Sequence, residues 1–162
     1  MTDIEELYKR HSQDVYRFAC WLSGNPHEAE EIVSETFLRL WGSLDDVKVA
    51  TVKAYLLTIA RNLFLSERKR ANRRETLPEV IQDDSPTPDV LAEQKDEVKA
   101  TMKAIQLLPE KQRACLLMRV QHDVSYEEIA RSLEISVSAA KVNVHRARLK
   151  LAQLCEASGE VT

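Results

Sequence analysis

One stretch near the carboxyl terminus has the residue types needed to bind a polyanion. Residues 135–151 contain no carboxylate, while lysine, arginine and histidine recur through them. Cationic side chains neutralise phosphate groups, and the absence of acids removes repulsion from a nucleic-acid backbone. A solvated basic face on a structural helix is the alternative interpretation of the same charges. The side chains expected to face a nucleic acid are Ser136, Ser138, Lys141, Val142, His145, Arg146 and Arg148.

The spacing of apolar residues places this stretch on the second helix of a helix-turn-helix. Helical periodicity on both sides of residues 134–136 predicts two helices joined by a tight turn. Ser125 and Glu128 form a capping box for the first helix, and the serine that ends the turn can cap the second. Small residues at Ala130 and Ala140 would let the two helices cross closely. In this motif the second helix enters the major groove of DNA.

A second cationic cluster lies at the end of an earlier helix. That helix is predicted from about Val52 to Arg74, and its inward residues are Leu56, Ile59, Ala60 and Leu63. Residues 61–74 contain six basic residues, beginning with Arg61, against one acid. An aromatic and an amide lie upstream on one flank, and this combination suits stacking, hydrogen bonding and phosphate neutralisation along a nucleic-acid strand. Cations also pair with the negative end of a helix, but six exceed that need. The candidates are Tyr55, Asn62, Ser66, Arg68, Lys69 and Arg73.

The helix predicted over residues 26–41 has the opposite polarity. Asn25 can cap it, and Glu28, Glu31, Glu35 and Leu38 are expected on its outward face. Acids in a first turn usually serve capping and solubility, which does not explain an exposed leucine beside them. Apolar burial with charge-guided orientation would suit a basic partner protein.

The remaining composition limits the class of protein. A chain of 162 residues, 44% hydrophobic and 30% charged, is typical of one or two small globular domains. No apolar run approaches the roughly 18 residues of a membrane span, and the amino terminus is too polar for a signal peptide, so a cytoplasmic location is expected. Cys20, Cys115 and Cys155 form no CxxC pair and are expected as reduced packing residues. An enzyme finds no support, and we expect no metal and no cofactor.

Helical periodicity covers the chain except for one acidic segment. Residues 78–97 contain seven acids and one base, and three prolines interrupt residues 76–93. The predicted fold is all-α, with two small helical domains joined by a flexible acidic linker. The first domain includes an amphipathic helix whose inward stripe contains Tyr8. The predicted boundaries are 1–75 for the first domain, 76–97 for the linker, 98–155 for the second domain and 156–162 for a tail.

In this order and spacing, the segments resemble the extracytoplasmic-function (group IV) sigma factors of bacterial RNA polymerase, within the sigma-70 family. The resemblance covers nearly the whole chain and implies that the first domain is region 2 and the second is region 4. Glu134 stands where relatives frequently have a turn glycine. The matching segments are HEAEEIVSETFLRLW (27–41), AYLLTIARNLF (54–64), the acidic linker, LLPEKQRACLLM (107–118), SYEEIARSLEIS (125–136) and AAKVNVHRARLKL (139–151).

The resemblance also implies partners and residue roles. Core RNA polymerase would be bound through its clamp coiled coil and flap, and promoter DNA through the minus-10 and minus-35 elements. Asn62 would help to hold a flipped base, and residues 137–151 would read the minus-35 element. An anti-sigma factor or another regulator is the expected controlling partner, and no small-molecule substrate is expected. The clamp-binding residues would be Glu28, Glu31, Ser34, Glu35 and Leu38.

An ordinary helix-turn-helix regulator, binding duplex DNA without directing initiation, is the alternative. It would explain the carboxyl-terminal half of the chain. It would leave the acidic helix and the flank around Asn62 without a role, so the two hypotheses separate on whether the protein binds core polymerase.

Overall fold

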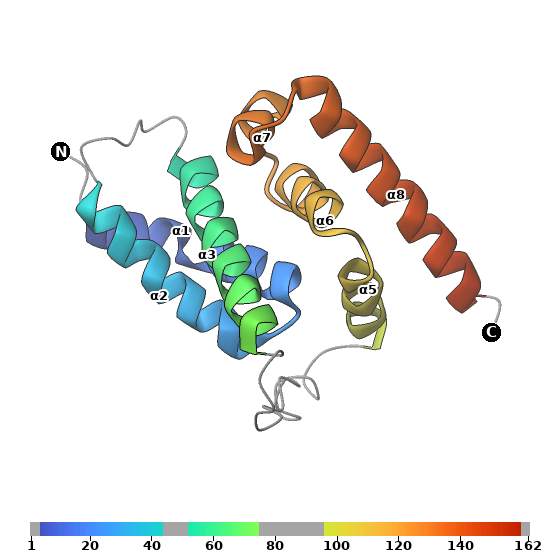
Figure 1. The fold of residues 1–162 in the computed structure, drawn as a ribbon, viewed down its shortest axis with the longest axis horizontal. Helices are drawn as coiled ribbons and strands as arrows, with labels where there is room; N and C mark the ends of the chain where they lie inside the picture. The colour runs from blue at the N-terminus through green and yellow to red at the C-terminus, as the bar shows by residue number, and fades with distance from the viewer. Residues whose placement is uncertain (1–3, 44–51, 75–95, 160–162) are drawn as a thin grey trace.

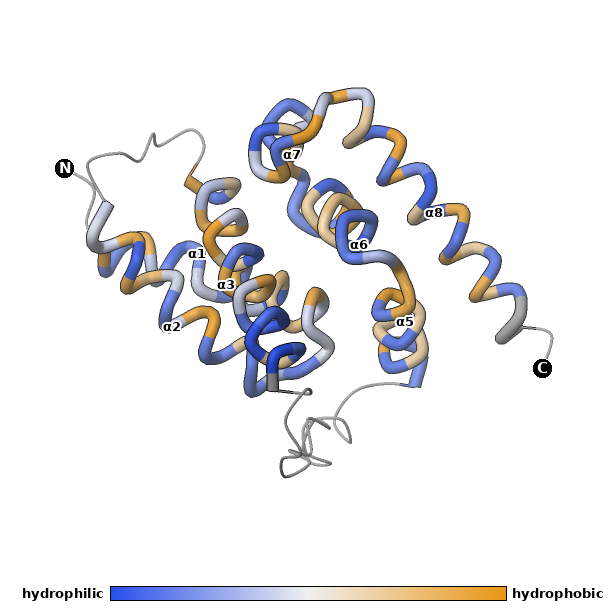
Figure 2. Tube along the Cα trace, viewed as in Figure 1, coloured by the Kyte–Doolittle hydropathy of each residue, from blue (hydrophilic) through white to orange (hydrophobic). Residues whose placement is uncertain are grey.

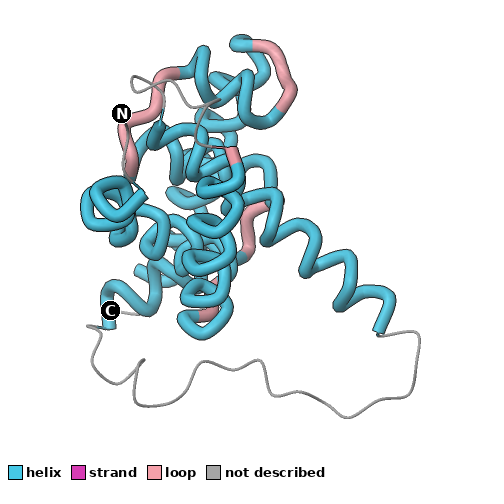
Figure 3. The backbone as a smooth tube through the Cα atoms, turned by 90° about the vertical axis from the view of Figure 1, so that its left-hand side faces the viewer, coloured by secondary structure: helices cyan, strands magenta, loops and turns pink. Residues whose placement is uncertain are grey.

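The computed structural model describes residues 4–43, 52–74 and 96–159, arranged as two groups of helices (Figure 1). Every regular element among these residues is helical, as Figure 3 shows. None of the described helices combines the length and apolarity needed to cross a bilayer. Residues 76–95 of the predicted linker lie outside the described residues. The helices are α1 (Ile4–Ser23), α2 (Pro26–Gly42), α3 (Val52–Arg74), α5 (Asp96–Gln106), α6 (Glu110–Leu116), the π-helical η3 (Leu117–Gln121), α7 (Tyr126–Leu133) and α8 (Val137–Gly159).

Three helices begin at the predicted capping residues. The Asn25 side-chain oxygen accepts hydrogen bonds from two backbone N–H groups in the first turn of α2, with N···O distances of 3.0 and 3.2 Å. Ser125 accepts one from α7 at 3.2 Å, and Ser136 accepts one from α8 at 3.0 Å. These bonds satisfy donors that have no partner inside the helix. The three predicted caps are therefore confirmed.

The helices α1, α2 and α3 form the predicted three-helix bundle. Each packs against the other two. Phe18, Leu22, Leu40 and Leu56 are fully buried in its centre. Burial of one such side chain contributes roughly 1.5–3 kcal/mol. In Figure 2 hydrophobic and hydrophilic residues alternate along α2, as expected for a helix with one buried face.

The helices α5 to α8 form the second unit, in which α7 and α8 are the predicted helix-turn-helix. The helix α8 packs against α6 and α7, and both Ala130 and Ala140 are buried. Glu134 ends α7 in the left-handed conformation, with φ 57° and ψ 46°. Glycine favours this conformation because it has no Cβ. The turn therefore keeps the geometry of the motif with a residue that is strained there.

The two units pack directly on each other. The helix α1 contacts α5, α6 and η3, and α3 contacts α7. The last carbonyl groups of α1 have no partner within their own helix. Gln106 donates to the carbonyl of Trp21, and Arg113 donates to that of Leu22 at 2.6 Å. Arg68 of α3 donates to the carbonyl of Ser23 at 3.2 Å. Elements distant in sequence therefore complete the end of α1.

The helix α3 is buried over a wider face than predicted. Leu56 is buried as expected, but Ile59 and Leu63 are only half-buried. Leu57 and Phe64, which were not assigned to the core, are buried. The second unit contacts α3 through α7 and through the Glu110 carboxylate, and an isolated three-helix bundle would lack both contacts. The periodicity of one helix cannot reveal a second packing partner.

Smaller predictions also need correction. Tyr8, assigned to the inward stripe of α1, is 48% exposed, and its ring packs edge-on against Phe37 at 5.0 Å. Cys155, expected to pack in the interior, is exposed, whereas Cys20 and Cys115 are buried. The helix α5 begins inside the predicted linker, and α8 continues into the predicted tail.

Candidate nucleic-acid interface

The outer face of α8 presents the predicted cationic surface. Ala140, Val144 and Ala147 are buried against the second unit. The residues between them point away from the core because 3.6 residues make one helical turn. Figure 1 shows α8 at the edge of the molecule, on the side away from α1 to α3. The exposed residues here are Ser136, Ser138, Lys141, Val142, His145, Arg146 and Arg148.

The flank of α3 brings most of its predicted residues to the surface. Asn62, Ser66, Lys69 and Arg73 are exposed. The Tyr55 side chain is half-buried, and its hydroxyl shares a hydrogen bond of 3.0 Å with the hydroxyl of Ser43, at the end of α2. A polar flank is thus followed by a basic end on one continuous helix.

Arg61, counted among the cations of this cluster, is not on the surface. Its side chain is 8% exposed and donates two hydrogen bonds of 2.7 Å to the carboxylate of Glu110, at the start of α6. Such bidentate pairs are among the stronger charged contacts in proteins. This pair joins the two units, and it removes Arg61 from the surface of this packed arrangement.

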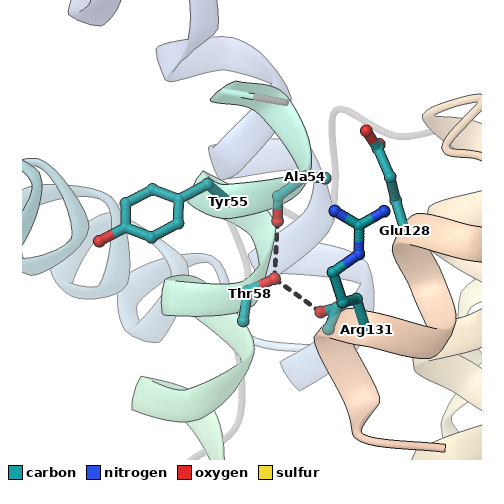
Figure 4. Close-up of a pocket in the computed structure, with 6 residues that line it drawn as sticks. Ala54, Tyr55, Thr58, Glu128 and Arg131 are labelled. Atoms are coloured by element: carbon teal, nitrogen blue, oxygen red, sulfur yellow. Dashed lines mark hydrogen bonds between the residues drawn. The ribbon is translucent and has the colours of Figure 1, made fainter. Parts of the chain in front are cut away.

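A groove lies between α3 and α7, with a cavity of about 250 Å³ (Figure 4). The Thr58 hydroxyl donates to the carbonyl of Ala54 at 2.7 Å. Because a hydroxyl has one proton, the 2.6 Å bond between Thr58 and Ser132 must have Ser132 as donor. Figure 4 shows the Tyr55 ring pointing away from α7. The groove is lined by Ala54, Tyr55, Thr58, Glu128, Arg131 and Ser132.

The outward face of α2 carries four of the five residues expected to contact polymerase. Glu31, Ser34 and Glu35 are exposed, and Leu38 is 62% exposed. Trp41, one turn further along, is 65% exposed and was not among the predicted contact residues. An apolar stripe beside carboxylates therefore remains uncovered within the described structure.

Glu28 departs from this face. Its side chain is 17% exposed, and it lies 3.9 Å from Arg68 of α3. Arg68 also lies over the Phe64 ring, with its guanidinium carbon 4.8 Å from the ring centroid. The start of α2 packs toward α3, so Glu28 is turned toward the bundle. One carboxylate oxygen of Glu28 therefore lies near Arg68, one of the predicted DNA-contacting residues.

Profiles of the sigma-70 family match the chain in the order of its two helical units. The profile described as "Sigma-70 region 2" matches residues 7–74, and that described as "Sigma-70, region 4" matches residues 99–151. The ECF RNA polymerase sigma factor SigL of Mycobacterium tuberculosis is 31% identical over 160 residues, covering 93% of this chain and 90% of that one. The chain belongs to the ECF sigma factors.

Other relatives of this sigma factor differ in length. SigE of Mycolicibacterium smegmatis is 32% identical over 156 residues, covering 93% of this chain but 61% of that protein, so the chain spans about three-fifths of its length. SigM of Bacillus subtilis is 27% identical, covering 93% of this chain and 94% of that one. The two profiles and these relatives together show that the protein is an RNA polymerase sigma factor that directs promoter recognition and transcription initiation.

A solved structure shares the arrangement of both units. The sigma factor RpoE of Bartonella quintana, in complex with the anti-sigma factor NepR, matches with a TM-score of 0.80 and 25% identity, covering 96% of this chain and 98% of that one. The sigma factor CnrH, in complex with the cytosolic domain of CnrY, has the same fold, with a TM-score of 0.72 and 22% identity.

Sequence reasoning missed the residues by which this sigma factor joins its two units. Arg61 and Glu110 are 49 positions apart, and Thr58 and Ser132 are 74 apart. The only local signal was that Arg61 follows buried Ala60 within an apolar run. An arginine in such a position is buried mainly when it is paired, but periodicity cannot name its partner.

Proposed function

We propose that this sigma factor reads two promoter elements with two separate helices. The exposed flank and basic end of α3 contact the minus-10 element and help to melt it, and the outer face of α8 reads the minus-35 element. The observation that carries this proposal is the exposed face of α8 over residues 137–151, which contain no acid. The minus-10 contacts are Tyr55, Asn62, Ser66, Arg68, Lys69 and Arg73, and the minus-35 contacts are Ser136, Ser138, Lys141, Val142, His145, Arg146 and Arg148.

The outward face of α2 is the proposed docking site on the polymerase clamp. Leu38 and Trp41 supply apolar area, and Glu31 and Glu35 supply charge that orients a basic partner. Ser34 lies on the same exposed face. Glu28 contributes indirectly, by holding Arg68. Region 4 contacts the polymerase flap in this proposal, and the protein acts in the cytoplasm without chemistry of its own.

The packed arrangement of the two units is the closed state in this proposal. Minus-10 and minus-35 elements lie about 25 base pairs apart, which is roughly 85 Å of duplex. The helices α3 and α8 are each about 35 Å long, and α3 is hydrogen-bonded to α7 through Thr58 and Ser132. Both elements cannot be read at once in this arrangement. Core polymerase therefore has to separate the units, as the flexible linker predicted from the sequence between domains 1–75 and 98–155 would permit.

An anti-sigma factor or a similar regulator is the proposed controlling partner. The arrangement of this chain is like that of RpoE in its complex with NepR, and the likeness extends over 96% of the chain. A partner that binds both units would stabilise the closed state by mass action. Promoter access would then depend on release of that partner.

Reconstituted transcription tests the proposal. Core RNA polymerase is incubated with the full chain and a randomised promoter library, and run-off transcripts are sequenced. We expect transcripts that begin a fixed distance downstream of two enriched elements. A protein that binds duplex DNA alone and never directs core polymerase would instead be a helix-turn-helix regulator.

A further inference from the structure

Tyr126 is contacted by cations from two other elements. It is the first residue of α7, and its half-buried ring packs against the hydrophobic core. The guanidinium carbon of Arg119, in η3, lies 4.8 Å from the ring centroid. The ammonium nitrogen of Lys141, in α8, lies 5.8 Å from the same centroid. Both distances are within the range of a cation–π interaction.

The two cations differ in how firmly they are held. Arg119 donates to the carbonyl of Val124 at 3.3 Å and lies 3.8 Å from the carboxylate of Asp123. That carboxylate is 96% exposed, so water screens it. Lys141 is exposed, and its described contact is with the Tyr126 ring. The ring is therefore the group that restricts where the lysine ammonium lies.

We infer that Tyr126 is a positioning residue for promoter DNA, which holds the ammonium of Lys141 at the edge of the α8 surface where a backbone phosphate passes. Arg119 supplies a second cation beside the same phosphate path. This inference rests on the proposed function of α8 as the minus-35 reader. It adds a specific role for Tyr126 and Arg119, neither of which lies on the exposed face of α8.

A restricted lysine binds phosphate better than a free one. A lysine side chain loses rotamer freedom when it is fixed by a ligand. The aromatic ring restricts Lys141 before DNA arrives, so less freedom is lost on binding. The ammonium has three donors, and one side of it can face the ring while an N–H donates to a phosphate oxygen. The contact with the ring and the contact with DNA are therefore compatible.

A double-mutant cycle tests the coupling between the ring and the lysine. The probe is a promoter duplex selected from a randomised library by holoenzyme containing the full chain. Tyr126→Leu should weaken holoenzyme binding about two- to fivefold, because fixing a free lysine side chain on DNA costs about 0.5–1 kcal/mol more than fixing a restricted one. The same change in a Lys141→Ala background should have almost no effect, because the lysine is already absent. Tyr126→Phe keeps the ring and should restore binding to within about twofold.

Salt dependence separates positioning from a general structural effect. Loss of one phosphate contact lowers the slope of log affinity against log salt by about 0.9. In the protein that keeps Lys141, Tyr126→Leu should lower this slope, although the substitution removes no charge. Thermal unfolding of each variant shows whether the fold is retained. An unchanged slope with an equal loss of binding in both backgrounds would make Tyr126 only a packing residue and overturn the inference.

The failure of the proposed function gives a different result. If Lys141→Ala binds the selected duplex as tightly as the unchanged protein, α8 does not read DNA through this face, and both proposals are overturned. If Lys141→Ala binds weakly while Tyr126→Leu acts independently of it, only the role of Tyr126 is overturned.

Discussion

The ion pair between Arg61 and Glu110 should decide how firmly the two units stay packed. Both hydrogen bonds are 2.7 Å, and the side chains are only 8% and 23% exposed. Glu110→Gln leaves the guanidinium buried without a counter-charge, and breaking a buried pair in this way costs about 3–5 kcal/mol. Because Glu110 keeps some contact with water, we expect about 3 kcal/mol. That energy corresponds to roughly a hundredfold shift from the closed to the open state.

The distance between two spin labels in the free full chain measures this shift. One label is attached to Cys155, which is exposed on α8, and the other to a cysteine that replaces exposed Glu30 on α2. Cys20 and Cys115 are buried, and burial raises the pKa of each thiol, so they react slowly with the label. The unchanged pair should give one narrow distance, and Glu110→Gln should add a broad population at longer distances.

Two controls show whether the buried charge is responsible. Arg61→Met combined with Glu110→Met should stay closed, because an apolar pair of similar volume replaces a buried ion pair at little cost. Glu6→Gln breaks an ion pair of 3.2 Å with Arg10 whose side chains are more than half exposed, and such pairs contribute at most about 1 kcal/mol. Glu110→Gln with the same narrow distance as the unchanged chain would refute the reasoning, as would equal opening by Glu6→Gln.

Three further predictions follow from particular residues. Burial, followed by smaller effects of nearby charges, lowers the pKa of His122 to about 4 from an ordinary 6.5, so the folded protein favours neutral His122. Its contribution to stability is complete above pH 6.5 and is lost as the pH falls toward 4. In urea titrations over this pH range, the free energy of unfolding of His122→Leu should fall by roughly 3 kcal/mol less than that of the unchanged protein. Glu134→Gly should raise the free energy of unfolding by about 1 kcal/mol in the same assay, because it relieves the left-handed φ of 57°; an unchanged value would show that the turn carries no strain. Glu35→Lys with Leu38→Asp should weaken core polymerase binding at least tenfold in pull-down titrations while circular dichroism stays helical, and unchanged affinity would exclude this face of α2.

Local signals in the chain were sufficient for the helices and their caps. Asn25, Ser125 and Ser136 cap the helices that follow them, because a capping side chain reaches only two or three residues along the chain. The acid-free face of α8 was equally visible, since residues with helical spacing share a face regardless of the partner. The recognition as an ECF sigma factor, which rested on the order of such segments, is confirmed.

Other features depended on residues that are distant in the sequence. Arg61 belonged by position to a cationic cluster, yet Glu110 of the second unit removes it from the surface. Glu28 belonged by periodicity to the outward face of α2, yet it lies against Arg68 of α3. The ring of Tyr126 meets cations from η3 and α8. None of these pairings has a local signature.

The sequence by itself determined where the helices lie, which faces are apolar and which are charged, because these properties follow from bonding and spacing within a few turns. The tertiary structure alone decided which charged side chains remain available to partners. Two charges pair only when packing brings them within a few ångströms. That distance is set by how α1 and α3 meet the second unit, and not by the spacing of residues along either helix.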